Sequence, residues 1–333
     1  MRDRAAFSIR TISFAAVLSA TLAAASPAVA QDWPTRLVTM VVPYAAGSAS
    51  DVTARVLAPR LSELLGQQVV IDNAGGAGGM TGSARVAKAA PDFHQFVLGN
   101  AGTHAQNQTL YRHPLYNAAT DFAPVVLIAT SSFALFTRSD LPVRNLQEFI
   151  AYTRANQAKM QYGTAGAGSA MHFACLLLNA AIGVNVTHVP YRGSPAVSQD
   201  LIAGRIDYMC PVAQVAIPLV DGGTAKAIAA LTTRRLALLP DVPSTREQGL
   251  GDFDVDGWWA FFMPKGTPAA IVRRLHDATV ATMETPAVQE RMKAIGADLV
   301  APDRRSPEYL QSFVEREIAR WAEPIGSAGL ALD

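Results

Sequence analysis

Short apolar runs alternate along the chain with segments in which apolar residues recur at helical spacing. Residues 37–42 form a β-branched apolar run, and in residues 52–65 the apolar side chains recur three and four positions apart. The first pattern predicts a strand and the second a helix, which Gly66 is placed to end. More elements of the same kind follow: strands at 69–71 and 96–99, and a helix at 83–90. Such alternation favours an α/β fold with a mixed, mainly parallel sheet flanked by helices.

A second set of strand and helix patterns lies between two long apolar segments. These segments, 125–137 and 256–262, have the composition of strands that cross between two lobes. The elements predicted between them are helices at 146–155, 170–181, 194–203 and 213–221, and strands at 160–163, 186–191, 206–210 and 225–231. Helices predicted at 269–284, 286–295 and 307–328 return to the first lobe. We therefore expect lobe 1 to comprise residues 31–130 and 257–333, and lobe 2 to comprise residues 131–256.

Residues 1–30 have the pattern of a secretory signal peptide. Three arginines precede an alanine-rich apolar run, and residues 28–30 read Ala-Val-Ala. Serines and a threonine interrupt the run, which is shorter than the roughly 20 apolar residues that a membrane span needs. We expect cleavage before Gln31 and a soluble periplasmic protein, with no cysteine near the cleavage point for a lipid anchor.

The charge and cysteine content exclude several classes of function. The whole chain has 28 Lys and Arg against 27 Asp and Glu. A nucleic-acid-binding protein needs a basic excess or stripe, and this sequence has neither. Cys175 and Cys210 are too few for a disulfide framework and lack the spacing of a zinc site. The sequence leaves their pairing open, and we slightly favour two separate buried thiols.

Two loops of small residues have the composition of anion-binding turns. Residues 43–51 and 163–169 each follow a predicted strand and precede a predicted helix, and both contain glycine and hydroxyl side chains. In open α/β sheets, helix N-termini at such positions present unpaired N–H groups to a ligand. The alternative is that glycine and serine here serve only turns and helix caps.

Several short strings resemble those of a known family. They are Trp33-Pro34-Thr35-Arg36, Val41-Val42-Pro43-Tyr44 with Gly47 and Asp51, Asn73-Ala74-Gly75-Gly76-Ala77-Gly78-Gly79, Val86-Ala87-Lys88-Ala89-Ala90-Pro91-Asp92, Leu110-Tyr111, Gly166-Ala167-Gly168-Ser169 with His172, His188-Val189-Pro190-Tyr191-Arg192-Gly193, Asp200-Leu201 with Gly204 and Asp207, Leu239-Pro240-Asp241-Val242-Pro243 and Lys265-Gly266-Thr267-Pro268. Their order and spacing, from about Asp32 onward, are similar to those of the tripartite tricarboxylate transporter substrate-binding proteins, also called the Bug or TctC family.

The resemblance implies a two-lobed, periplasmic-binding-protein-like (type II) fold whose cleft closes by hinge motion around a small organic acid. The ligand is a mono-, di- or tricarboxylate, aromatic acids included, captured for uptake or sensing. The implied partners are that acid and either a membrane permease pair or a sensor receptor. A monomer without cofactor, nucleic acid or enzyme activity is expected.

The family's ligand contacts carry over to matching positions here. In the family, backbone amides, hydroxyls and ordered waters hold the carboxylate at the loop after the first strand and at the glycine/serine loop of the second lobe. The corresponding ligand-binding residues are Tyr44, Ala45, Gly47, Ser48 and Asp51 in lobe 1 and Thr164, Ala165, Gly168, Ser169 and Asp207 in lobe 2, with Thr103 and His104 lining the same cleft. Ser48 replaces a usual second glycine and adds a donor. Pro211 stands where the family often has an aspartate, which disfavours a cationic amino-acid ligand.

Some of these residues have a structural alternative. Asp51 is as well placed to cap the following helix as to contact ligand. Asp207 can satisfy backbone donors, and His172 and His188 fit structural roles better than ligand contact. Trp258 and Trp259 favour the core, although one of them can wall the cleft.

A secreted α/β hydrolase using Ser169 is the main alternative function. Ser169, a histidine at 172 or 188, and Asp207 supply the residue types of a catalytic triad. The Gly-x-Ser-x-Gly elbow is absent, however, and no HExxH metal motif occurs. The glycines at 75–79 lack the following lysine of a phosphate-binding loop. The sequence thus favours binding over catalysis.

Overall fold

Two β-sheets organise the protein in a computed structural model that describes residues 33–90, 92–251 and 253–327. The predicted signal peptide and Ala328, the last residue of the final predicted helix, lie outside these residues. We call the six-stranded sheet with its helices lobe 1 and the five-stranded sheet with its helices lobe 2. The lobe boundaries predicted from the sequence remain a proposal.

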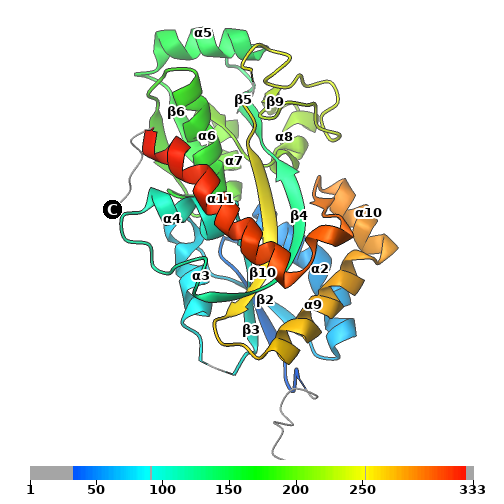
Figure 1. Cartoon of the computed structure of the whole chain (residues 1–333). Coiled ribbons are helices and arrows are strands. Elements are labelled where there is room, and N and C mark those ends of the chain that lie inside the picture. Colours follow the sequence, from blue (N-terminus) through cyan, green and yellow to red (C-terminus); the bar gives the residue numbers. More distant parts are fainter. Residues whose placement is uncertain (1–32, 91, 252, 328–333) are drawn as a thin grey trace, which may run out of the picture. The chain divides into compact units, whose positions relative to one another are not determined.

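Lobe 1 is built on a mixed sheet. Its strand order is β11-β4-β10-β3-β1-β2 (Figure 1). The strands are β1 (Val38–Val42), β2 (Val69–Asn73), β3 (Gln95–Asn100), β4 (Phe122–Ser132), β10 (Asp256–Pro264) and β11 (Asp298–Leu299). The helices are α2 (Ala49–Leu65), η2 (Ala77–Gly79), α3 (Met80–Ala87), η3 (Gly102–Gln106), α4 (Asn107–Leu110), α9 (Ala269–Met283), α10 (Pro286–Ala294), η5 (Pro302–Arg304) and α11 (Pro307–Ser327). β1 pairs in parallel with β2 and β3, whereas β10 is antiparallel to β3 and β4.

Lobe 2 repeats this architecture on a smaller sheet with the order β7-β6-β8-β5-β9. Its strands are β5 (Ala134–Arg138), β6 (Gln161–Thr164), β7 (Thr187–Pro190), β8 (Tyr208–Met209) and β9 (Ala225–Ala230). Its helices are α5 (Leu146–Asn156), α6 (Ala170–Ala181), α7 (Ser194–Ile202), η4 (Ala213–Val215) and α8 (Ile217–Asp221). The predicted fold class is therefore confirmed. Among the described residues, none of the helices is long and apolar enough to span a bilayer.

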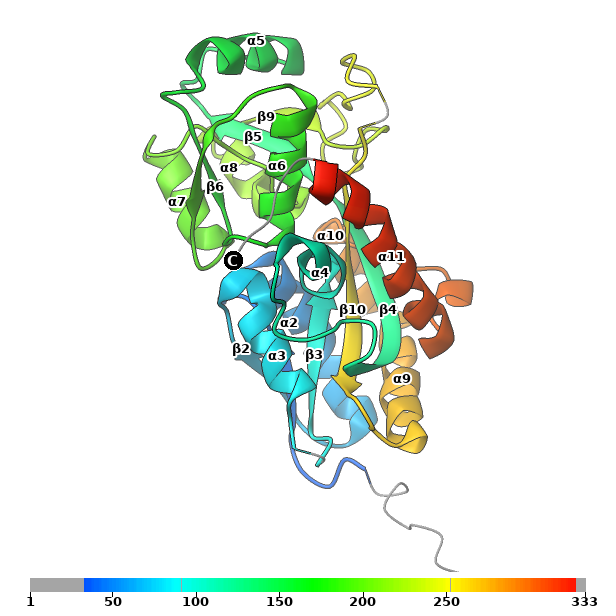
Figure 2. The same cartoon turned by 60° about the vertical axis from the view of Figure 1, so that its left-hand side comes forward.

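The apolar segment predicted as one crossing strand is in fact two strands. β4 belongs to the sheet of lobe 1 and β5 to that of lobe 2, with the buried Phe133 between them. Phe133 forms an isolated bridge with Val212 of lobe 2, which marks the residue where the chain changes sheets. β4 and β10 run side by side in both views, with α11 packed against β4 (Figure 2).

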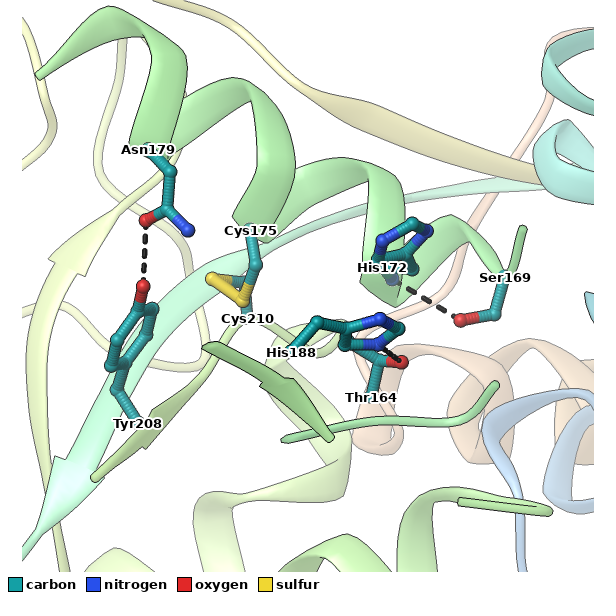
Figure 3. Close-up of a disulfide and its surroundings, with 8 residues drawn as sticks. All are labelled: Thr164, Ser169, His172, Cys175, Asn179, His188, Tyr208 and Cys210. Carbon is teal, nitrogen blue, oxygen red and sulfur yellow. Dashed lines mark hydrogen bonds between the residues drawn. A yellow bond between two sulfur atoms is a disulfide. The ribbon is translucent and has the colours of Figure 1, made fainter. Parts of the chain in front are cut away.

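A disulfide joins Cys175 of α6 to Cys210, the residue after β8 (Figure 3). Their Cα atoms lie 5.3 Å apart, within the usual range for a bridge, and both residues are fully buried. The expectation of two separate thiols was wrong, because α6 packs directly over the end of β8. A hydrogen bond of 2.6 Å from Tyr208 Oη to Asn179 Oδ1 ties the same helix to the same strand.

We expect removal of this bridge to destabilise the protein without changing its fold. The cysteines are 35 residues apart, and closing a loop of that length stabilises the native state by about 2 to 4 kcal/mol. The double variant Cys175→Ala, Cys210→Ala should lose that much in urea unfolding followed by circular dichroism. Equal unfolding midpoints with and without reductant, or two free thiols titrated in the denatured wild type, would contradict the assignment.

Candidate ligand-binding site

A cavity lies where the loops after β1 and β6 meet. The residues that line it are Tyr44, Ser48, Ala49, Ser50, Asn100, Ala101, Ser131, Phe133, Ala165, Ser169, Ala170, Met171, Ser194, Pro211, Val212, Val215, Gly257, Trp258 and Trp259. The space open to the centre of a water molecule is about 60 Å³. Both lobes contribute to its walls, so the cavity is a space between them.

On the lobe 1 side, the cavity is formed by the N-terminus of α2. Ser48 is the N-cap, and its Oγ accepts a 3.3 Å hydrogen bond from the N–H of Asp51. Gly47 has a φ of 78°, a conformation that favours glycine, and it turns the chain into the helix. The first N–H groups of a helix have no partner inside it, and Ala49 and Ser50, which line the cavity, carry two of these groups.

On the lobe 2 side, α6 repeats this arrangement. Ser169 is the N-cap, and its Oγ accepts a 3.1 Å hydrogen bond from the N–H of His172. Gly168 precedes it with a φ of 77°. Ala170 and Met171, the first two residues of α6, line the cavity. Their backbone N–H groups have no partner within the helix.

A third group of donors comes from the carboxyl end of β3. Asn100 Oδ1 accepts a 3.0 Å hydrogen bond from the N–H of Thr103, which leaves the Nδ2 group as a donor for a ligand.

Tyr44, in the loop after β1, is held by a hydrogen bond to η2. Its Oη donates to the carbonyl of Gly78 at 3.0 Å. Burial raises the pKa of Tyr44 far above its ordinary value, so the phenol stays neutral.

Glycines allow the facing loops to touch. A Cβ at Gly78 would lie 2.4 Å from the carbonyl oxygen of Ala167, and one at Gly193 would lie 2.8 Å from Ala45 Cβ. Tyr111 Oη also donates to the Ala167 carbonyl, at 2.9 Å. Each small-residue loop thus touches the opposite lobe: residues 163–169 contact Gly78, and residues 43–51 contact Gly193. Residues of both loops also line the same cavity, as the binding hypothesis requires.

The lining residues include no Asp, Glu, Lys, Arg or His. The positive potential in the cavity therefore comes from helix N-termini, each equivalent to about half an elementary charge. They are those of α2 and α6, together with that of α7, whose first residue Ser194 lines the cavity. Neutral N–H and O–H donors with this potential suit an anion such as a carboxylate. Within the described part of the chain, no cluster of three or more metal-ligating side chains occurs.

The predicted site residues fall into three groups. Tyr44, Ser48, Ala165 and Ser169 line the cavity, whereas Ala45, Gly47, Asp51, Thr103, Thr164 and Gly168 shape or support its loops. Asp51 accepts hydrogen bonds from the N–H of Gly47 and from Asn73 and Arg55. Burial alone would raise the pKa of Asp51, but these bonds outweigh it and lower the pKa.

His104 and Asp207 lie apart from the cavity lining. His104 is fully buried, with its ring stacked on Phe262 at 4.0 Å between centroids. Asp207 accepts hydrogen bonds from Arg138 Nε at 3.0 Å and from the N–H of Gln161 at 2.7 Å, where it links β5, β6 and β8. The bond to Gln161 is the backbone contact that the structural alternative for Asp207 predicted, whereas the ion pair with Arg138 was not predicted.

The residues carried over from the family leave out four polar lining residues: Ser50, Asn100, Ser131 and Ser194. Of these, Ser50 lies within the small-residue loop predicted at 43–51. Ser194 is the first residue of α7, Ser50 is the second residue of α2 and Asn100 is the last residue of β3, so their positions in the predicted units were a usable signal. Ser131 lies inside a long apolar segment and gave no such signal.

The hydrolase alternative finds no support in the geometry. Ser169 Oγ bonds the backbone of His172, whose ring instead accepts the N–H of Gly168 at 3.1 Å. His188 Nε2 bonds Thr164 Oγ1 at 2.7 Å. Asp207 bonds Arg138 and orients neither imidazole, so no nucleophile, base and acid are aligned.

Two stacked imidazoles support the loop after β6. The rings of His172 and His188 lie 4.2 Å apart (Figure 3). His188 also stacks on Tyr162. Burial lowers the pKa of His172 to about 3, helped by the neighbouring His188, and lowers that of His188 to about 4. Both rings are neutral near pH 7, which keeps His172 Nδ1 free to accept the N–H of Gly168.

This bond predicts a difference between two substitutions of His172. Asparagine can place Oδ1 near the position of Nδ1 and keep an acceptor for Gly168, whereas leucine cannot. An orphaned buried N–H costs about 1 to 3 kcal/mol. His172→Leu should therefore lower the free energy of unfolding by about that much relative to His172→Asn in urea titrations. Equal losses would show that only ring packing matters.

The same burial predicts acid sensitivity. Burial lowers the pKa of His104 to about 3, so three histidines have folded pKa values well below the value of about 6.5 in an unfolded chain. Their contribution to stability is complete above pH 6.5 and is lost as the pH falls towards the folded values, because the unfolded chain binds protons first.

As the pH falls below about 6.5, protonation of each of these histidines in the unfolded chain should lower the free energy of unfolding by up to about 1.4 kcal/mol per pH unit. Urea titrations between pH 7 and pH 5 should show this decline. This range lies above the pKa values of most carboxyl groups, so histidine titration dominates it. His172→Asn should make the slope shallower. A stability that is flat over this range would overturn the prediction.

Known proteins resemble this chain over nearly its whole length. Residues 53–330 match the model of the tripartite tricarboxylate transporter family receptor. The UPF0065 protein in the TAR-I ttuE-ttuC' intergenic region of Agrobacterium vitis is 38% identical over 301 residues, 90% of this chain and 87% of that protein. BugT of Bordetella pertussis is 30% identical over 324 residues, 97% of this chain and 98% of that protein.

Solved structures of the same kind superpose closely. The periplasmic binding protein BugD has a TM-score of 0.86 at 36% identity, covering 90% of this chain and 99% of its own. MatC from Rhodopseudomonas palustris, with bound malate, has a TM-score of 0.85 at 36% identity, covering 88% and 100%. Another R. palustris protein, with adipate, has a TM-score of 0.84 at 36% identity, covering 90% and 99%. The chain therefore belongs to the tripartite tricarboxylate transporter receptor family, as its sequence strings indicated.

Proposed function

We propose that this protein captures a small organic acid in the periplasm and holds its carboxylate between the N-termini of α2 and α6. One observation carries the proposal: two serine-capped helix N-termini, one from each lobe, border a single cavity that no charged side chain lines. Each helix end supplies unpaired N–H donors and a partial positive charge. A carboxylate bridging both ends makes contacts that only the closed arrangement offers.

Closure follows from this difference in contacts. A ligand shifts a two-state equilibrium only by its extra interactions in the favoured state. Separation of the lobes would remove one of the two helix ends from the acid group. Bending at the connections between the two sheets, near Phe133 and Asp256, fits hinge closure of this kind.

The solved structures give a guide to the size of the ligand. Two of them, each 36% identical to this chain, contain malate and adipate, which are short dicarboxylates. We therefore expect the ligand of this protein to be a small organic acid of similar length.

The cellular role follows from the family and the N-terminal pattern. Residues 1–30 would direct export and be removed before Gln31. The loaded protein would then deliver its acid to a membrane permease pair or to a sensor receptor. The lack of an aligned triad supports a binding role without turnover.

Substitution of Ser169 tests the proposal. Ser169→Asp keeps a good N-cap for α6 but places a carboxylate where the ligand's acid group would lie, whereas Ser169→Asn keeps the cap without charge. We expect the aspartate variant to bind short carboxylates at least about a hundredfold more weakly than the asparagine variant, since like charges in an enclosed site repel strongly.

Calorimetric titration with a panel of short carboxylates, together with the melting temperature of each variant, gives the measurement. Similar affinities for the aspartate and asparagine variants would exclude the α6 N-terminus as the anion site. Steady hydrolysis of esters without any binding of acids would exclude the binding role altogether.

A further inference from the structure

The two ends of the cavity differ in polarity. Trp259 of β10 pairs with Asn100 of β3, beside the N–H and O–H groups that we propose to bind the carboxylate. Gly257 of β10 pairs with Ser131 on β4. Residues two apart on a strand face the same side, about 6 to 7 Å from each other. The cavity thus extends along β10 from the helix N-termini to a second end, which we call the hinge end.

The hinge end is almost entirely apolar. It is formed by Ser131, Phe133, Pro211, Val212 and Gly257. A Cβ at Gly257 would lie 3.1 Å from the Phe133 ring and 3.3 Å from Ser131 Oγ, and Phe133 bridges to Val212, so these residues are neighbours. No α-helix of eight or more residues begins among them, and no charged side chain lines the cavity.

Ser131 holds the single side-chain hydroxyl of the hinge end. The residue is 3% exposed, and among the described residues its Oγ has no hydrogen-bond partner. The nearby indole N–H groups are already used, because Trp258 donates to Glu317 at 3.0 Å and Trp259 donates to Ser50 at 3.0 Å. A buried hydroxyl without a partner is uncommon and calls for one.

We propose that the hinge end recognises an uncharged hydrogen-bonding group of the ligand through Ser131, and hence that the preferred ligand is a short monocarboxylate with a hydroxyl or carbonyl at its far end. This inference rests on the proposed function, because it assigns the opposite end of the same cavity. Serine can donate to a carbonyl and both donate to and accept from a hydroxyl. A second carboxylate would meet one hydroxyl and no compensating charge, which makes its removal from water unfavourable.

Three acids of one chain length test the proposal: 4-hydroxybutyrate, butyrate and succinate. They share one carboxylate and differ at the far end by a hydroxyl, a methyl-terminated chain or a second carboxylate. We expect wild-type protein to bind 4-hydroxybutyrate about fivefold more tightly than butyrate, which is the value of one net hydrogen bond, and to bind succinate more weakly than either.

Ser131→Ala should remove the preference for the hydroxyl, so that 4-hydroxybutyrate and butyrate bind the variant with similar affinity. The matched control is Ser132→Ala, the next residue on β4, whose hydroxyl bonds Asp256 at 3.1 Å and lies outside the lining; it should keep the preference. Gly257→Ala should weaken binding of all three acids, because the added methyl occupies the hinge end.

The outcomes separate the two proposals. Succinate binding as tight as that of 4-hydroxybutyrate, or an unchanged preference in Ser131→Ala, would overturn the assignment of the hinge end while leaving the carboxylate site intact. If none of the three acids, nor any other short carboxylate, shifted the melting temperature of the wild type, the proposed function itself would fail. The ligand series on wild-type protein decides the matter even if a variant does not fold.

Discussion

A carboxylate that leaves water must regain nearly all of its hydrogen bonds, and the design of this cavity follows from that constraint. The lining provides no cation, so the compensation has to come from backbone N–H groups and hydroxyls. Helix N-termini are the places where a fold leaves such donors unpaired. Bringing α2 and α6 together from different lobes doubles the number of donors around one anion.

The residues around the two helix ends keep those donors in position. Ser48 and Ser169 cap the helices, and Gly47 and Gly168 turn the chain into them with positive φ angles. In lobe 2, the disulfide and the bond between Tyr208 and Asn179 hold α6 against β8. Helix α6, which carries Ser169 at its N-terminus, is therefore held against the sheet before a ligand binds. Closure around a ligand then loses little free energy to ordering this helix.

Much of the architecture was predictable, because it depends on local patterns. The predicted helix at residues 170–181 coincides with α6, and Gly66 ends α2 in a left-handed conformation as expected. The short strand β11 and the helical turns at η3 were not predicted, because two-residue strands and π-helical turns carry almost no periodic signal. The long apolar segment at 125–137 was read as one strand, since hydrophobicity alone cannot show where a chain changes sheets.

The sequence by itself determined the family, the α/β class and the two loops that face the cavity, because serine caps, glycine turns and apolar periodicity act over a few neighbouring residues. The tertiary structure alone decided which residues meet across long separations. It paired Cys175 with Cys210, assigned Asp207 to Arg138, and brought Ser131 into the cavity beside Gly257. These contacts depend on how strands far apart in the chain are ordered and registered, and that information is not contained in any local stretch of the sequence.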